Sequence, residues 1–96
     1  MGLNSHPKGT MNTRERLLDN GYENVECFIN ESYDTALIGV SDDNRAIYDY
    51  DLMIEYLMDK YDWSEEEAID WVEYNTIRAL PYMGKNAPIV MYRLLD

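Results

Sequence analysis

Two short apolar runs joined by a polar reversal, between residues 35 and 48, constrain the fold of this chain more than any other feature. The first run, "TALIGVS" (35–41), is apolar on both faces, which is typical of a covered, internal strand. The reversal "SDDNR" (41–45) is rich in Asp and Asn, which tolerate positive φ and bond their own backbone. Because "AIY" then returns as a short strand, the sequence predicts a β-hairpin.

Two further segments have strand patterns. In "NVECFI" (24–29), Val25, Cys27 and Ile29 alternate on one face. The last apolar segment, "PIVMYRLL" (88–95), is largely apolar on both faces and therefore favours the middle of a sheet. Together with the hairpin, these segments predict about four strands.

Capping residues and helical spacing predict two to three helices. A short one lies within "NTRERLLDNGY" (12–22), where the Asn-Gly pair is a typical helix stop. Another runs from residue 49 or 51 to about residue 61, with apolar side chains along one stripe. The third begins at Ser64, where "SEEE" is a capping box, and ends near Pro81.

The order of these elements predicts an α+β fold, α-β-β-β-α-α-β, with a small, mostly antiparallel sheet covered by two to three helices. We expect a single domain over residues 12–96, because 96 residues leave no room for a second one. Residues 1–11 have no periodic apolar pattern, and we interpret them as a flexible leader or an expression remnant.

The formal net charge of −11 is concentrated in one third of the chain. Residues 42–73 hold twelve acids against two bases and so contribute −10. This balance disfavours direct binding of nucleic acid, because the phosphate interaction that supplies most of such affinity would be repulsive.

The chain has few of the residue types that usually carry out catalysis or bind metals. His6, the only histidine, lies in the leader, and Cys27 is the only cysteine, which we expect to be a buried, inert thiol. A hard-cation site at the four Asp residues between 42 and 51 is a weak alternative, because their spacing differs from a calcium-binding loop. We therefore expect no enzyme activity, no metal and no cofactor.

No apolar run approaches the roughly 18 residues that span a bilayer, so we expect a soluble, cytoplasmic protein.

The acids and tyrosines of residues 48–74 form a candidate binding face. Glu66, Asp70 and Glu73 follow i, i+4, i+7 spacing and so form a row along one helix. Such a face attracts a basic protein, and tyrosine supplies the amphipathic anchor that binding hot spots favour. A solvated surface without a partner is the alternative explanation of the charges. The predicted partner contacts are Glu55, Asp59, Glu66, Asp70 and Glu73, with Tyr56 or Tyr74 as anchor.

A less acidic stretch, "EYNTIRALPYMGKNAPIVMY" (73–92), follows this face. We interpret its bases as structural: Arg78 suits the negative end of a helix, and Lys85, with Arg93 just beyond, offsets part of the negative field. Alternatively, Asn75, Arg78 and Tyr82 form a second, polar binding patch.

The segments "YNTIRALPYMGKNAPIVM" and "ALIGVSDDNRAIYDYDLMIEYLM" also carry a resemblance. Over about residues 13 to 94, the chain resembles a family of small acidic proteins of unassigned function encoded by phages and mobile elements of Gram-positive bacteria. The resemblance implies no catalytic residue. It implies a genomic setting in which small acidic proteins are often inhibitors of host proteins, including nucleic-acid mimics that block nucleases.

Two hypotheses therefore stand for the function. In the first, the acidic face engages a basic host protein, such as a nuclease or another DNA-binding protein. In the second, the chain is a structural or regulatory module that self-associates, as a homodimer for example, through apolar or sheet-edge surface, while the acids serve solubility.

Overall fold

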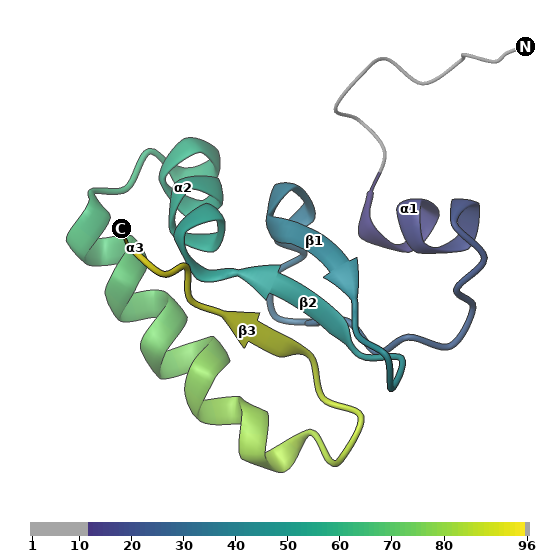
Figure 1. Ribbon diagram of the computed structural model, residues 1–96. Coiled ribbons are helices and arrows are strands. Elements are labelled where there is room, and N and C mark those ends of the chain that lie inside the picture. Colours follow the sequence, from purple (N-terminus) through teal and green to yellow (C-terminus); the bar gives the residue numbers. More distant parts are fainter. Residues whose placement is uncertain (1–11, 96) are drawn as a thin grey trace, which may run out of the picture.

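The computed structural model describes residues 12–95, which form an α+β fold with three helices and a three-stranded mixed sheet (Figure 1). The predicted leader, residues 1–11, lies outside the described residues. The helices are α1 (Thr13–Asp19), α2 (Tyr50–Tyr61) and α3 (Glu65–Trp71), and the strands are β1 (Leu37–Val40), β2 (Ala46–Asp49) and β3 (Ile89–Met91). None of the described helices has both the length and the apolar character needed to cross a membrane.

The predicted hairpin is confirmed. Strands β1 and β2 pair antiparallel, with Leu37 opposite Tyr48 and Val40 opposite Ala46. The turn between them uses Asn44 at φ 66°, and the amide of Ser41 donates to the carbonyl oxygen of Arg45. The Asp- and Asn-rich reversal therefore acts as its sequence predicts.

The strand predicted at residues 24–29 does not form. The sheet therefore has three strands among the described residues instead of about four, and the first strand of the expected order is missing. Val25 and Phe28 are buried while Ile29 is 90% exposed, so the alternation that predicts a strand is broken. In addition, the carbonyl oxygen of Val25 accepts a hydrogen bond from Nη2 of Arg14, 2.9 Å away, instead of one from a neighbouring strand.

The last strand is shorter than predicted and lies at an edge. The sheet order is β1-β2-β3, and β3 pairs parallel to β2, with Tyr48 opposite Val90. The expectations of a central last strand and of a mostly antiparallel sheet are therefore wrong. The central strand is β2, in which Ala46, Tyr48 and Asp49 are all buried. Ala46 and Tyr48 belong to the hydrophobic core, which explains the burial of these side chains.

The capping box predicted at Ser64 and the helix stop predicted at Asn20-Gly21 are confirmed. Asn12 and Glu15 form a capping box at α1, and Ser64 and Glu67 form another at α3, each with the side chain of one residue bonded to the backbone of the other. Gly21, at φ 89°, follows α1 in the left-handed conformation that glycine adopts at low cost. The carboxylate of Asp49 caps α2 by accepting from the amide of Leu52.

The third helix continues beyond Trp71 as one helical segment, 65–82, through a π-helical turn (Val72–Thr76) and a 3-10 turn (Ile77–Tyr82). Ala68, Val72 and Thr76 are buried along its inner side. Figure 1 shows this segment and α1 on opposite sides of the sheet. The hydroxyl of Thr76 lies 2.6 Å from the hydroxyl of Tyr33, and both side chains are fully buried.

We expect Tyr33→Phe to lower the free energy of unfolding by about 1 to 2 kcal/mol, because the buried Thr76 hydroxyl loses its partner. Urea unfolding followed by circular dichroism measures the change. Thr76→Val combined with Tyr33→Phe should be less destabilising than the sum of the two single changes, since the pair then leaves no unpaired hydroxyl. Strict additivity would contradict a direct interaction.

Candidate partner-binding surface

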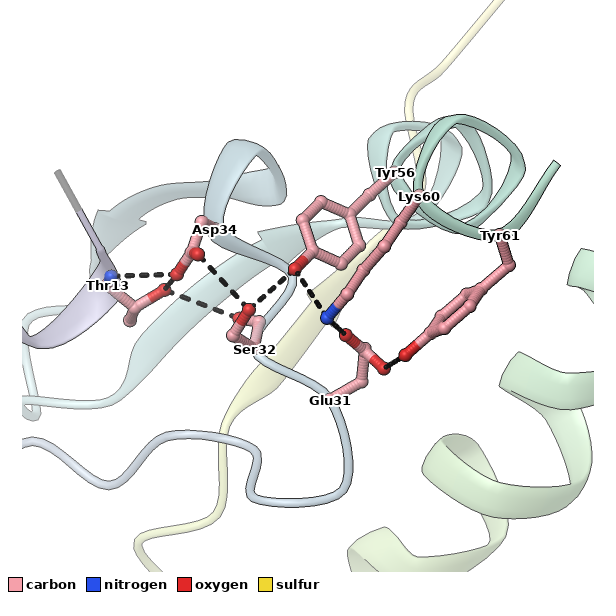
Figure 2. Close-up of polar contacts among 7 residues, drawn as sticks. All are labelled: Thr13, Glu31, Ser32, Asp34, Tyr56, Lys60 and Tyr61. Carbon is pink, nitrogen blue, oxygen red and sulfur yellow. Dashed lines mark hydrogen bonds and ion pairs between the residues drawn. The ribbon is translucent and has the colours of Figure 1, made fainter. Parts of the chain in front are cut away.

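A chain of polar contacts fixes α2, which carries part of the acidic face (Figure 2). The carboxylate of Glu31, which is 6% exposed, accepts from Nζ of Lys60 at 2.6 Å and from the hydroxyl of Tyr61 at 2.7 Å. The hydroxyl of Tyr56 lies 2.7 Å from that of Ser32. Ser32 in turn donates to Asp34, which accepts from Thr13 at the start of α1. The C-terminal end of α2 is therefore tied to the loop before the sheet and to α1.

The contacts of this network stabilise the charged forms of Lys60 and Glu31. Hydrogen bonding to the Glu31 carboxylate raises the pKa of Lys60, so the ammonium stays charged. Burial raises the pKa of Glu31, but the hydrogen bonds from Lys60 and Tyr61 outweigh it, and the pKa of Glu31 lies below its ordinary value of 4.5. Neither group is poised to exchange a proton near neutral pH.

Asp49 is held in the same way at the other end of α2. Its carboxylate accepts from Nε of Arg93 at 2.6 Å and from the amide of Leu52 at 3.1 Å. Burial raises the pKa of Asp49, but these hydrogen bonds outweigh it and leave the pKa below its ordinary value of 3.8. Arg93, for which we expected a structural role, forms an ion pair with this buried carboxylate.

The stability of the fold should fall at acid pH. Because the pKa values of Glu31 and Asp49 are lower in the folded than in the unfolded chain, their contribution is full above the unfolded-state pKa values and is lost as pH falls through the folded ones. We expect a steady free energy of unfolding from pH 7 to about pH 5 and a steep fall below about pH 4. Urea unfolding over this pH series measures it. Glu31→Gln should flatten the fall, and an unchanged slope in that variant would contradict the assignment.

Of the residues predicted to contact a partner, Tyr56 and Glu73 are engaged within the fold. The Tyr56 ring is half-buried against Tyr33, with 5.8 Å between the ring centroids, and its hydroxyl is bonded to Ser32. Glu73 is half-buried and accepts from the hydroxyl of Tyr50 at 2.7 Å. Because the hydroxyl of Tyr56 is engaged within the fold, Tyr74 is left as the predicted anchor.

The remaining predicted contacts are exposed. Glu55 and Asp59 lie on α2, and Glu66 and Asp70 lie on α3. Tyr74, in the π-helical turn, is 66% exposed. The structure therefore brings Asp70 and Tyr74 to one surface of the helical segment 65–82, while Glu55 lines a different depression, between α2 and α3.

An open depression of about 400 Å³ lies on the outer side of segment 65–82. Glu67, Asp70, Trp71 and Tyr74 follow i, i+3, i+4, i+7 spacing, which brings side chains to one face of a helix. We call this depression the acidic aromatic groove. Its lining residues are Trp63, Glu67, Asp70, Trp71, Tyr74 and Asn75.

Aromatic rings form the walls of the acidic aromatic groove. The ring centroids of Trp63 and Trp71 lie 6.4 Å apart, and Tyr61 stacks on Trp63 at 4.8 Å. The partner contacts predicted from the sequence include neither tryptophan. The outward repeat of acids and aromatics at helical spacing was the signal that could have revealed them.

Two of the three residues proposed as a second patch border this groove. The side-chain amide of Asn75 donates to the carbonyl oxygen of Trp71, and Asn75 lines the groove. The guanidinium carbon of Arg78 lies 5.3 Å from the centroid of the Tyr74 ring. Tyr82 is 90% exposed at the end of the helical segment. Asn75 and Arg78 therefore belong to the edge of the acidic aromatic groove.

Cys27 is half-buried and lies outside the sheet, which corrects its predicted place in a buried strand. Its sulfur is 3.6 Å from Nη2 of Arg14. Within residues 12–95, no three His, Cys, Asp or Glu side chains are grouped as they would be around a metal ion.

Comparisons of the chain with models of protein families, with curated proteins and with solved structures gave no match. The resemblance to acidic phage and mobile-element proteins stays a prediction.

Proposed function

We propose that this chain is a non-enzymatic binding protein whose acidic helical surface engages a basic protein. The observation that carries the proposal is the acidic aromatic groove, which places two carboxylates, Glu67 and Asp70, beside three aromatic side chains. Aromatic residues are enriched among binding hot spots, and carboxylates select a basic partner by charge.

The surroundings of the groove support a basic partner. Exposed acids flank it along α3 and α2, and most of the net charge of −11 belongs to residues 42–73. Such a field accelerates encounter with a positively charged surface and repels nucleic acid. The partner class follows from this field: a protein with a basic surface, such as a nuclease or another DNA-binding protein.

In the fuller form of this proposal, the chain is a phage or mobile-element product that acts in the cytoplasm as an inhibitor or nucleic-acid mimic. A mimic occupies the basic site that otherwise holds nucleic acid. Duplex DNA should therefore displace the captured partner from the immobilised protein at constant ionic strength. A partner that binds this chain and DNA at the same time would contradict mimicry.

Self-association is a second candidate function, favoured by the position of β1 at an edge of the described sheet. A depression of about 290 Å³ runs between this edge strand and α1, lined by residues that include Leu17, Tyr22 and Ile38. Exposed sheet edges can pair with another chain. Light scattering separates the two functions: a dimer that persists as salt is raised supports self-association, and a monomer whose capture of basic proteins weakens with salt supports the acidic surface.

A further inference from the structure

We infer that the acidic aromatic groove binds one arginine side chain of the partner. This inference rests on the proposed function and names the chemical group that the groove recognises. The groove combines the two features that an arginine uses: flat aromatic faces on Trp63, Trp71 and Tyr74, and a carboxylate on Asp70.

The carboxylates of the groove are available to a cation in different degrees. One oxygen of Glu67 accepts from the amide of Ser64 in the capping box, so this side chain is fixed in position with a second oxygen remaining. Asp70 is exposed, and its carboxylate is bonded to no other side chain among residues 12–95. Asp70 is therefore the residue placed to pair with an incoming guanidinium.

The chain already contains one contact of the proposed kind. The guanidinium of Arg78 lies over the ring of Tyr74, 5.3 Å from its centroid, at the edge of the groove. This is the distance at which a cation is attracted to the negative face of an aromatic ring. A second guanidinium would meet the tryptophan rings in the same manner, with Asp70 beside it.

Arginine is favoured over lysine for a physical reason. The planar guanidinium stacks on aromatic rings and can donate two parallel hydrogen bonds to a carboxylate, while the lysine ammonium is more strongly hydrated and acts as a point charge. Long-range attraction by the acidic field is the same for both. Discrimination between peptides of equal charge therefore reports the groove, and their common affinity reports the field.

The test compares binding of nona-arginine and nona-lysine peptides to the whole chain. Both tryptophans of the chain, Trp63 and Trp71, line the groove, so intrinsic tryptophan fluorescence reports this site. We expect nona-arginine to bind about fivefold more tightly and to change the tryptophan emission. Asp70→Asn and Tyr74→Ala, both at exposed positions, should remove this preference, while the matched control Glu23→Gln should retain it.

The outcomes separate the inference from the proposed function. Equal affinity for the two peptides, with unchanged tryptophan emission, would overturn arginine recognition and leave salt-sensitive binding by the acidic surface standing. A preference for nona-arginine that survives in both groove variants would also overturn the inference. Failure of both peptides to bind at low salt would overturn the inference and the proposed function together.

Discussion

Replacing Lys60 by methionine is expected to lower the free energy of unfolding at pH 7 by about 2 kcal/mol, which corresponds to a melting temperature lower by about 10 °C. The ammonium of Lys60 lies 2.6 Å from the buried carboxylate of Glu31, and its removal leaves a charge inside the protein with only neutral partners. Loss of one member of a buried pair costs about 3 to 5 kcal/mol, and the half-exposed lysine reduces this figure.

The pH dependence and a double variant check the cause of this loss. Without Lys60, burial raises the pKa of the Glu31 carboxyl relative to the wild type, so this carboxyl is protonated first as the pH falls and the destabilisation relative to the wild type should shrink. Lys60→Met combined with Glu31→Leu removes the uncompensated charge and should recover part of the stability. Urea unfolding of the wild type, the Lys60→Met variant and the double variant at pH 7 and pH 4 measures these differences. A loss that is independent of pH would contradict the electrostatic explanation.

Reversing two charges on α3, Glu66→Lys with Asp70→Lys, is expected to weaken binding of a basic peptide or protein by about 30-fold. Each exposed ion pair contributes up to about 1 kcal/mol, and reversal replaces each attraction with a repulsion. Both side chains are exposed on α3, so the fold should be retained. Isothermal titration with nona-arginine at about 0.1 M salt measures the change.

A matched variant separates local contact from overall charge. Asp19→Lys with Glu23→Lys alters the net charge equally, at exposed positions in and after α1. Figure 1 shows α1 across the sheet from segment 65–82. We expect only about a threefold loss of affinity from this variant, because screening weakens charges that are more than about 8 to 10 Å from the contact. Equal losses in both variants would mean that no particular surface of the chain binds.

Local sequence signals predict much of this fold because they act within a few residues. The capping box of α3, the Asn-Gly stop after α1 and the β1–β2 turn depend on residues only a few positions apart, and all three form as expected. The strand expected at 24–29 fails for a tertiary reason. The side chain of Arg14 takes the carbonyl oxygen of Val25, and Ile29 turns outward, neither of which a pattern of alternation records.

The candidate site likewise contains some residues that local spacing predicts and others that only tertiary contacts place. Helical spacing predicts that Asp70 and Tyr74 share a surface, and they line one groove. It does not reveal that the hydroxyl of Tyr50 would engage Glu73, because these residues lie 23 positions apart in the sequence. Nor does it place Trp63 beside Trp71, since Trp63 precedes the helix and its direction depends on the chain reversal at Asp62, where φ is 57°.

Affinity capture from a bacterial lysate, at low and moderate salt, tests the acidic surface most directly. The baits are the wild-type chain, the Glu66→Lys, Asp70→Lys variant and the Asp19→Lys, Glu23→Lys control. We predict that basic, nucleic-acid-binding proteins are retained by the wild type and the control and lost from the α3 variant. Retention of the same proteins by all three baits, or capture of none, would contradict a working acidic surface.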